Sequence, residues 1–395
     1  MITETQEYDI VIAGGGMTGA ILAIALSRLN PAGRKYRIAL VEAKQPQQKL
    51  HPGFDGRAIA LSARTVSALK QFDIWPALSA AAHAIHHIHV SEKGHAGRVT
   101  IDATEFALPA LGYVLELSDA GYQLYQMLQQ IPEISHYCPV KLDSFEQQPD
   151  FVSLSLSSGE QLSTRLLVSA EGAQAVIPQQ LHLPVQQHDF SQSAIITTLN
   201  VDQPVNARAW ERFTAEGPLA LLPLGENSYS VVWCQQPAEA VEAMQLSDAA
   251  FTSQLQQAFG YRAGRFLNIG ERAVYPLSLR YLPQMTHHRI VLLGNAAHQL
   301  HPVAGQGFNL AMRDIISLQE VLAEAVDPGG YSELQRYRQY RDDDQQRTIW
   351  MTSSLATLFT EPAASLVIPR QLGLMLMNRV SCLKNGLVQQ ALGHR

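Results

Sequence analysis

Hydrophobic residues follow two patterns along this chain, and each pattern predicts a different kind of sheet. Mainly apolar runs at Tyr8–Ala13, Tyr36–Val41 and Ile290–Leu293 are typical of parallel strands buried on both faces. Residues 190–235 instead alternate between apolar and polar, with turns at Gly217–Pro218 and at residues 225–227, and this predicts an antiparallel sheet. Buried parallel strands are therefore expected at both ends of the chain, with a β-rich layer between them.

The intervening residues predict helices and hairpins. We expect helices from about Met17 to Leu29, from Ala63 to Phe72, and near Ala120–Gln130, and a polar helical segment over residues 238–260. A strand is expected at Val152–Leu156 that turns at Ser158–Gly159 and resumes at Gln161–Leu162. Further strands are expected at Leu166–Gly172 and at Ala273–Leu279, and a hairpin around Glu92–Gly94. The strand–helix–strand order at the start of the chain predicts an α/β protein.

A glycine motif, Gly14–Gly19, joins the first strand to the first helix. Gly14 permits a tight turn, Gly16 lets a pyrophosphate approach the main chain, and Gly19 allows the helix to pack closely on the strand. Glu42 ends the second strand, at the distance from Gly19 where an acid is expected to accept the ribose hydroxyls of an adenosine. The pattern predicts a dinucleotide site that also includes Met17 and Thr18.

A second glycine-bearing stretch, residues 294–309, follows the buried strand that ends at Leu293. A helix is expected to begin near Gly305, and its free N–H groups and partial positive charge would favour an anion. The candidate ligand-binding residues of this stretch are Asn295, Gly305, Gln306, Gly307 and Asn309.

Composition narrows the class of protein. The net charge of −6 over 395 residues gives no basic surface for nucleic acid. Three scattered cysteines without a Cys-x-x-Cys pair indicate neither a disulfide framework nor a zinc site. No signal peptide and no apolar run long enough to span a bilayer is evident, which predicts a cytoplasmic protein. Charged residues make up only 16%, which fits either a surface that contacts a membrane or partner, or polarity supplied by glutamine.

Three motifs in this order resemble the flavin-dependent aromatic hydroxylases of the para-hydroxybenzoate hydroxylase fold. Gly14–Gly19 with Glu42 is the first, and Ala170-Glu171-Gly172 stands where the family has Ala-Asp-Gly. The third is Gly294-Asn295-Ala296-Ala297-His298, where the family has Gly-Asp-Ala-Ala-His. Residues 51–61 and 217–220 are similar to the ubiquinone-biosynthesis branch of that family.

The resemblance implies a divided fold. We expect a Rossmann-like, GR2-type FAD-binding domain with an inserted antiparallel β-sheet substrate domain and a C-terminal helical tail. The FAD-binding segments would be residues 1–75, 113–180 and 273–326, the substrate segments residues 76–112 and 181–272, and the helical tail residues 327–395.

The resemblance also implies the chemistry. NADPH or NADH would reduce FAD, and dioxygen would react to a flavin hydroperoxide that hydroxylates a polyprenylated phenol, with 2-octaprenyl-6-methoxyphenol as the expected substrate. Alternatives stay open: a soluble aromatic substrate, an oxidase or reductase, or a flavin-bearing structural subunit among other ubiquinone-biosynthesis proteins. Glu171 and Ala175, where the middle motif has aspartate and often serine, leave the NADPH contacts open. Asn295 keeps hydrogen-bonding capacity beside a diphosphate without adding negative charge.

Three catalytic candidates come from the same resemblance. Arg57 would contact FAD or the nicotinamide nucleotide, and Pro302 would place its carbonyl near flavin and substrate. His298, or else His301, would help to deprotonate the phenol. The alternatives are a surface ion pair for Arg57, a turn without further role for Pro302, and a structural hydrogen bond for His298. Gly172, Gly305 and Gly307 would present main-chain groups to the flavin.

Two further features have competing interpretations. Five histidines gather at positions 83, 86, 87, 89 and 95, but no carboxylate or cysteine completes a metal site, so we expect surface or hairpin histidines and no bound metal. Residues 350–392 are rich in Leu, Met and aromatic residues, and Pro362 and Pro369 predict a division into three helices. This tail is expected either to dock on the inner face of the cytoplasmic membrane or to pack on the body or an oligomer interface.

Overall fold

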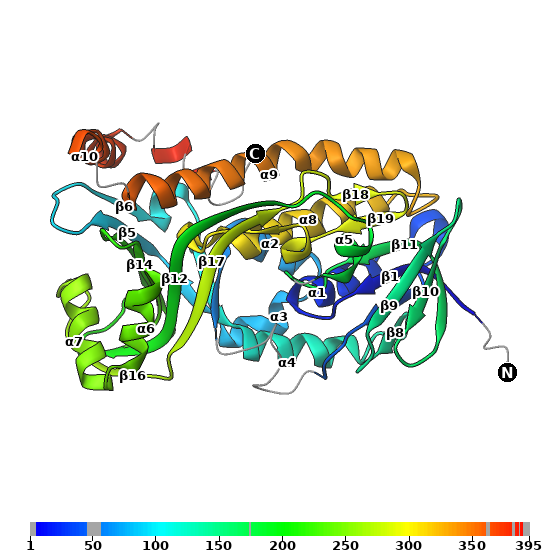
Figure 1. Cartoon of the computed structure of the whole chain (residues 1–395), viewed down its shortest axis with the longest axis horizontal. Helices are drawn as coiled ribbons and strands as arrows, with labels where there is room; N and C mark the ends of the chain where they lie inside the picture. The colour runs from blue at the N-terminus through cyan, green and yellow to red at the C-terminus, as the bar shows by residue number, and fades with distance from the viewer. Residues whose placement is uncertain are drawn as a thin grey trace.

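Two large sheets and one long helix organise the computed structural model, which describes residues 5–45, 57–173, 175–360, 364–380, 384–386 and 388–389. An eight-stranded sheet lies at the right of Figure 1 and a nine-stranded sheet at the left. Helix α9 (Tyr331–Thr360) runs along both. The α/β architecture with a second, largely antiparallel sheet that the sequence predicts is confirmed.

The eight-stranded sheet has a parallel centre in the order β19-β11-β1-β2-β8. Its apolar runs are buried, as the pattern predicts: β1 is fully enclosed from Tyr8 to Ala13. The strands of this sheet are β1 (Gln6–Ala13), β2 (Ile38–Val41), β8 (Ile134–Tyr137), β9 (Leu142–Gln147), β10 (Val152–Leu156), β11 (Gln161–Ser169), β18 (Thr286–His287) and β19 (Ile290–Leu292). The run expected over 166–172 lies at the end of one strand, which begins at Gln161 and ends at Ser169.

Helices α1, α4 and α8 form part of the same hydrophobic core as this sheet. Because α1 and α8 follow β1 and the end of β19, their N-termini lie at the carboxyl ends of parallel strands, where α/β folds bind ligands. The bounds are α1 (Met17–Ser27), α4 (Leu117–Leu128), α5 (Val176–Gln180) and α8 (Gln306–Leu322).

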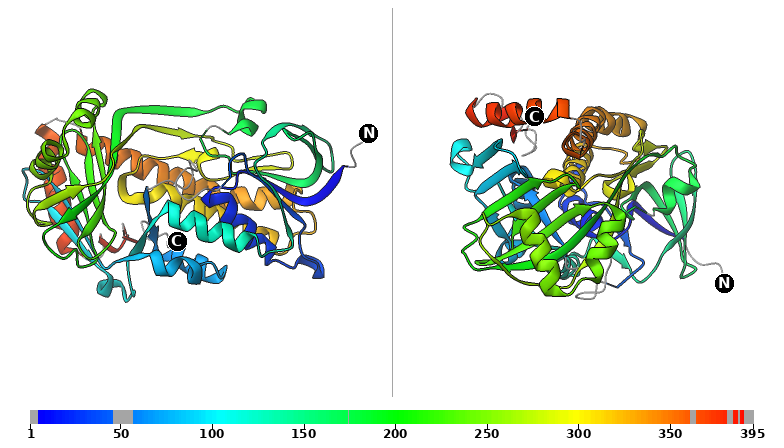
Figure 2. Two further views of the ribbon diagram at one scale, coloured as in Figure 1. Left: turned by 90° about the horizontal axis from the view of Figure 1, so that it is seen from below. Right: turned by 60° about the vertical axis from the view of Figure 1, so that its left-hand side comes forward.

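The nine-stranded sheet has the order β20-β17-β12-β15-β14-β13-β5-β6, with β16 paired to β12. Helices α6 (Pro237–Gln245) and α7 (Asp248–Phe259) cover its outer face and appear in front of it at the right of Figure 2. The strands are β5 (His87–Glu92), β6 (Arg98–Asp102), β12 (Gln186–Val201), β13 (Arg208–Phe213), β14 (Pro218–Pro223), β15 (Ser228–Gln235), β16 (Phe266–Ile269), β17 (Ala273–Tyr281) and β20 (His298–Gln299).

Strand β17 shows that the third predicted FAD-binding segment does not belong to one sheet. Residues 273–281, which open that segment, pair with β12 in the nine-stranded sheet, and β20 pairs with β17. After β17, the chain therefore returns to the eight-stranded sheet only at β18. The predicted domain boundaries otherwise stay a prediction, because hydrogen bonding alone does not divide one chain into folding units.

A third, small sheet has the order β3-β7-β4. It consists of β3 (Ala58–Ser62), β7 (Gly112–Glu116) and β4 (His83–Ile85). Helices α2 (Ala63–Gln71) and α3 (Trp75–Leu78) lie between β3 and β4 in the chain. Single 3-10 turns occur at Pro31–Gly33, Ser79–Ala81, Ala103–Phe106, Gly294–Ala296 and Val303–Gly305.

The C-terminal helices pack on the body. Helix α9 contributes Tyr337 to the core of the first sheet and Phe359 to the core beneath the second. Helix α10 (Ala364–Arg379) lies against β6, where α9 and α10 appear on one side of the molecule in Figure 2. Pro369 lies inside α10, so the prediction that it ends a helix is wrong, and Pro362 lies outside the described residues. Across the described part of the chain, no helix is long and apolar enough to cross a bilayer.

Candidate active site

The three predicted motifs meet at the carboxyl edge of the eight-stranded sheet. A Cβ on Gly14 would lie 2.4 Å from the carbonyl oxygen of Ala170, and a Cβ on Gly294 would lie 3.0 Å from Thr18 Oγ1. The first distance excludes a side chain where main chain passes main chain, and Gly294 has a left-handed φ of +55° that favours glycine beside Thr18. Segments from the start, the middle and the later part of the chain therefore share one site.

Gly16 and Gly19 have different surroundings, and the difference indicates where a ligand fits. A Cβ on Gly19 would lie 1.8 Å from Gly14 O, so Gly19 permits close contact of helix and strand. A Cβ on Gly16 would meet no heavy atom of the described residues within 4 Å, although Gly16 precedes the first residue of α1. This open space at a helix N-terminus fits the pyrophosphate of a dinucleotide. Met17 is buried beneath it.

Glu42 is fixed at the end of β2 by two main-chain donors. Gly15 N–H donates to Oε2 at 2.6 Å and Lys44 N–H donates to Oε1 at 2.8 Å. The carboxylate is thus held beside the glycine turn, in the position expected for an acid that accepts ribose hydroxyls.

The middle motif turns its acid toward helix α5. Glu171 Oε2 accepts a hydrogen bond from Ser169 Oγ at 3.2 Å and from Ile177 N–H at 3.4 Å. Burial raises the pKa of Glu171, opposed by these hydrogen bonds. Gly172 follows with φ +88°, a conformation that favours glycine. A contact of Glu171 with the nicotinamide nucleotide stays a prediction.

The third motif is held from behind by Asp314 of α8. Asp314 Oδ2 accepts Gly294 N–H at 3.2 Å and pairs with His298 Nε2 at 2.6 Å, while Oδ1 accepts Arg341 Nε at 2.8 Å. Burial would raise the pKa of Asp314, but His298 and Arg341 together hold it below its usual value. His298 is buried, and this contact favours a positioning role over the predicted catalytic one. Asn295 is exposed between buried neighbours.

Main-chain groups line the loop that leads into α8. Ala304 and Gly305 both have left-handed backbones, with φ +58° and +59°, and Gly305 is the N-cap of α8. A Cβ on Gly307 would meet nothing described within 4 Å, so this helix end is also open. Pro302 O accepts Gly305 N–H at 3.0 Å, and Gln306 Nε2 donates to Ala304 O at 3.1 Å.

Asn309 acts as a clamp between this loop and the small sheet. Its Nδ2 donates to Gly305 O at 2.8 Å and to Ala60 O at 2.9 Å. Its Oδ1 accepts Ser62 N–H at 2.8 Å and Thr65 Oγ1 at 2.7 Å. All these partners are protein groups, so the side chain shapes the loop, and a direct cofactor contact stays a prediction.

Arg57 bridges the small sheet and the nine-stranded sheet. Its guanidinium carbon lies 5.0 Å from the centre of the Tyr275 ring on β17, within the range of a cation–π contact. Its carbonyl oxygen accepts Leu117 N–H at 2.8 Å. Residues 51–56, which precede it in the branch-specific motif, lie outside the described residues.

His301 is neutral in this setting. Val303 N–H donates to His301 Nδ1 at 3.2 Å, and His301 Nε2 pairs with Gln192 Oε1 at 3.0 Å. Burial lowers the pKa of His301 to about 4. The ring therefore donates to Gln192 and supports the loop, which leaves it poorly suited to accept a proton from a phenol.

An apolar cavity of about 100 Å³ opens at this loop. Ala304, Gln306 and Asn309 form one wall, and the others come from the small sheet, the β5–β6 hairpin and the C-terminal region: Ala60, Leu61, Ser62, Ile85, Ile88, Ile101, Leu111, Gly112 and Val388. The cavity therefore opens beside residues 302–305, the loop before α8 that is called the flavin loop below.

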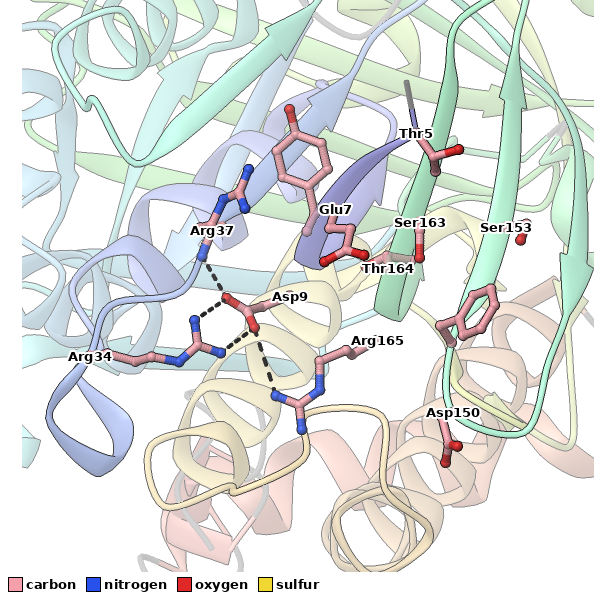
Figure 3. Close-up of a pocket in the computed structure, with 12 residues that line it drawn as sticks. Thr5, Glu7, Asp9, Arg34, Arg37, Asp150, Ser153, Ser163, Thr164 and Arg165 are labelled. Carbon is pink, nitrogen blue, oxygen red and sulfur yellow. Dashed lines mark hydrogen bonds and ion pairs between the residues drawn. The ribbon is translucent and has the colours of Figure 1, made fainter. Parts of the chain in front are cut away.

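A larger hollow, about 730 Å³, lies at the opposite, amino-terminal edge of the parallel strands (Figure 3). Two of its arginines are paired with Asp9, Arg34 at 2.6 Å and Arg165 at 3.7 Å, and the Arg37 guanidinium lies over the ring of Tyr8. Because ligands of parallel sheets bind at the carboxyl ends of the strands, this hollow is not the nucleotide site.

The histidines of the β4–β6 region have ordinary partners. His87 pairs with Asp102 at 2.7 Å, and the His89 ring lies 4.9 Å from that of Trp210. No group of three potential metal ligands occurs among the described residues.

Three charged residues important to this site were not singled out from the sequence: Asp314, Arg341 and Glu211. Asp314 and Arg341 are buried charges in helices α8 and α9. Glu211 lies on β13 between Ala209 and Phe213, which face the core below the flavin loop. Its only sequence signal is an acid at an inward position of an alternating strand.

Comparison with known proteins agrees with this geometry. The family model described as an FAD binding domain matches residues 7–351. The ubiquinone hydroxylase UbiL of Rhodospirillum rubrum is 29% identical over 98% of this chain and 89% of its own length. The 3-demethoxyubiquinol 3-hydroxylase of Escherichia coli is 30% identical over 98% and 99%.

The fold is also similar to that of a solved monooxygenase. The p-nitrophenol 4-monooxygenase PnpA of Pseudomonas putida superposes with a TM-score of 0.79 at 16% identity, covering 99% of this chain and 100% of that one. The converging glycine motifs, the match over residues 7–351 and the similarity to full-length relatives lead to one conclusion. The chain belongs to the FAD-binding family of flavin-dependent aromatic hydroxylases, in the branch of its ubiquinone-hydroxylase relatives.

Proposed function

We propose that this chain hydroxylates a polyprenylated phenol of ubiquinone biosynthesis, with 2-octaprenyl-6-methoxyphenol as the substrate, using NADPH or NADH and dioxygen. FAD, when bound, supplies the reduced flavin that activates oxygen. The names of the relatives, a ubiquinone hydroxylase and a demethoxyubiquinol hydroxylase, support the substrate class.

The observation that carries the proposal is the apolar cavity beside Ala304. Most of its lining residues are aliphatic, and the polar ones, Ser62, Gln306 and Asn309, lie at or beside the loop that leads into α8. Such a cavity favours a substrate with an apolar arm whose ring lies at the loop. A small polar aromatic compound would leave these aliphatic walls without a partner.

The residues of the chain have distinct tasks in this proposal. The open N-termini of α1 and α8 would hold the diphosphate and the flavin ring. Arg57, stacked on Tyr275, would close the side between the two sheets. Asp314 keeps the Gly294–His298 segment in place, and the closely packed loops would exclude water from the reacting ring.

A transient-kinetic experiment tests the proposal. The bound flavin is reduced anaerobically with NADPH or NADH in the presence of 2-methoxy-6-prenylphenol, oxygen is admitted, and flavin absorbance and product are followed. We expect nicotinamide-dependent reduction and a hydroxylated product. Return of oxidised flavin without product would favour an oxidase, and absence of reduction by either nucleotide would favour a structural subunit.

A cavity variant sharpens the choice of substrate. Ile88→Trp would reduce the cavity, so we expect a higher KM for the prenylated phenol than in the native protein and little change for 2-methoxyphenol. A native enzyme that turns over 2-methoxyphenol as well as the prenylated compound would instead favour a soluble aromatic substrate.

We also propose a peripheral contact of α10 with the membrane in which a polyprenyl substrate resides. Four side chains at helical spacing are exposed on it, with exposed fractions of 67%, 60%, 40% and 52%: Ile368, Leu372, Met375 and Leu376. An exposed apolar row on a helix fits an interfacial position. Ile368→Glu with Leu372→Glu should reduce flotation of the full-length holoenzyme with anionic liposomes; equal flotation of native and variant protein contradicts the contact. A stable complex with other ubiquinone-biosynthesis proteins through the same face would be lost in that variant too.

A further inference from the structure

Glu211 is an acid on the face of the nine-stranded sheet that looks toward the flavin loop. Strand β13 alternates, and the residues on either side of Glu211 on its face, Ala209 and Phe213, belong to the core that also contains Val303. On the neighbouring strand β5, Ala209 pairs with Ile88, which lines the apolar cavity, and Glu211 pairs with Val90, the next residue on the same face. Glu211 therefore lies on the face of the sheet that borders the space assigned to the substrate, one position along that face from the Ala209–Ile88 pair.

Its surroundings offer little compensating charge. The partners of Glu211 across the sheet are Val90 on β5 and Ala220 on β14. Burial raises the pKa of Glu211 to about 7. A carboxyl group with a pKa near neutrality accepts and returns protons readily at physiological pH.

The other titratable groups around Glu211 are occupied or neutral. The Cys234 thiol on β15 has a pKa raised by burial and by Glu211 itself. Glu92 lies on the same face of β5 as Val90, the partner of Glu211, and pairs with Arg370 at 2.6 Å. His301, just before the loop, is neutral, with a pKa lowered to about 4 by burial.

We propose that Glu211 is the general base that takes the proton from the ring hydroxyl of the phenolic substrate. The inference rests on the hydroxylation proposed above and adds a catalytic residue to it. The two histidines considered from the sequence are less suitable, because His298 pairs with Asp314 and His301 already accepts Val303 N–H. Neither constraint applies to Glu211, which lies on the face of the sheet that borders the cavity.

The proton balance is as follows. The phenol O–H bond breaks, its proton forms a new O–H bond on the Glu211 carboxylate, and the electron pair stays on the phenolic oxygen. The resulting phenolate donates electron density through its ring carbon to the oxygen atom delivered by the flavin reaction. After the C–O bond has formed, Glu211 returns its proton to the phenolic oxygen and the ring carbon loses its own proton to water. Glu211 ends as it began.

The test compares the native holoenzyme with Glu211→Gln, which keeps size and hydrogen bonding but cannot hold the proton. With 2-methoxy-6-prenylphenol as probe, the rate of product formation in a single turnover is measured across the titration of Glu211. We expect the native rate to rise with pH through about 7 and the variant to be at least ~100-fold slower without that rise. A fluorinated probe whose hydroxyl is already ionised should restore much of the variant's rate.

Two further measurements separate catalysis from structure. FAD content and the rate of flavin reduction by NADPH should be unchanged in Glu211→Gln, and the control Glu226→Gln, at the exposed β14–β15 turn, should behave as the native enzyme throughout. An infrared difference between native protein and Glu211→Gln should contain a carboxyl band that disappears as pH rises through about 7.

The outcomes distinguish the two proposals. Native protein that reduces its flavin but yields no hydroxylated probe overturns the proposed function, and the role of Glu211 with it. Native protein that yields product, while Glu211→Gln does so at the same rate or with the same pH dependence, overturns the role of Glu211 alone. Loss of FAD from Glu211→Gln would likewise contradict a catalytic role, because it indicates a structural one.

Discussion

At the scale of single residues, the site contains two kinds of glycine. At some, an added Cβ would clash with protein atoms, and at others it would meet open space. A Cβ on Gly14 or Gly19 would meet a main-chain oxygen at 2.4 Å or 1.8 Å, and Gly294 has a left-handed φ of +55°. Gly16 is of the second kind, with ordinary φ of −64° and open space where its Cβ would lie. This contrast separates residues that shape the fold from a residue that leaves room for a ligand.

Gly16→Val is therefore expected to abolish FAD retention while leaving the fold intact. The valine would occupy the space assigned to the pyrophosphate, but it would meet no protein atom described within 4 Å. Flavin absorbance per protein and thermal unfolding of the apoprotein measure the two effects. Gly373→Val in α10 is a matched control, since its Cβ position is equally open and lies far from the motifs along the chain. A yellow, stoichiometrically loaded Gly16→Val protein would contradict the assignment.

Glu211 makes a second prediction at this scale, in the pH dependence of stability. The carboxyl is expected to ionise near 4.5 in the unfolded chain and near 7 in the folded protein, so the folded state resists its ionisation. Native protein should therefore lose stability relative to Glu211→Gln as pH rises from about 4.5 to 7, by ~3 kcal/mol in total. Urea unfolding of both proteins at several pH values measures this difference. A difference that is independent of pH would mean that Glu211 is ordinarily solvated.

At the scale of elements, helix α9 supports the flavin motif through a buried charge network with α8. Arg341 reaches Asp314 and also Asp344, and Arg313 donates to Asp344 at 2.8 Å. The same Asp314 carboxylate holds Gly294 and His298. The orientation of the motif thus depends on a helix that begins only at Tyr331, well after the motif in the chain.

Arg341→Met should expose this dependence. Removing one partner from a buried ion pair leaves an uncompensated charge and typically costs about 3–5 kcal/mol. We expect a loss of that order in urea unfolding, together with weaker FAD binding measured by release of flavin fluorescence. Arg338→Met is the control on the same helix: its pair with Asp342, 3.5 Å apart, is partly exposed and should contribute about 1 kcal/mol or less. Equal effects of the two substitutions would remove the proposed support.

At the scale of the whole molecule, the C-terminal helices join the two sheets. Tyr337 lies in the core of the eight-stranded sheet, and Phe359 stacks on Phe213 of β13 with ring centres 3.8 Å apart. Arg370 of α10 pairs with Glu92 of β5. Val303 of the loop before α8 belongs to the same core cluster as Phe213 and Phe359, so the geometry of that loop depends on how the sheets are held together.

A chain that ends at Asp344 is accordingly expected to lose FAD and to unfold at a lower temperature. It would lack Thr348, which accepts Arg313 Nη2 at 2.9 Å, and Phe359. Phe359→Ala in the full-length chain should reproduce part of the loss, at about 3–5 kcal/mol. Calorimetry and flavin content measure both. A truncated protein with native Tm and full flavin would show that the tail is dispensable, and it would then be a suitable tool for testing membrane contact.

Much of the site could be predicted from local sequence because each motif is a short turn between a strand and a helix. The spacing of Gly14, Gly16 and Gly19 requires a particular turn, and Glu42 follows at the end of the next strand. Buried strands and the antiparallel insertion likewise follow from short-range patterns of apolar residues. These features are confirmed because they depend on neighbours a few positions apart.

Other features depend on pairing between distant residues. Whether β17 joins one sheet or the other is set by its register with β12, not by its own sequence. Pro369 stays inside α10 although proline costs an interior helix about 3 kcal/mol, because Arg370 and Leu374 anchor the helix on the body.

The sequence by itself thus determined the family, the three glycine-bearing turns that meet at the candidate site, and the kinds of sheet. Only the tertiary structure decided that Asp314 and Arg341 support the flavin motif and that Glu211 lies on the sheet face that borders the apolar cavity. The physical reason is that turns and strands follow from local sterics and burial, whereas the surroundings of a buried charge are made by elements that meet only when the chain has folded.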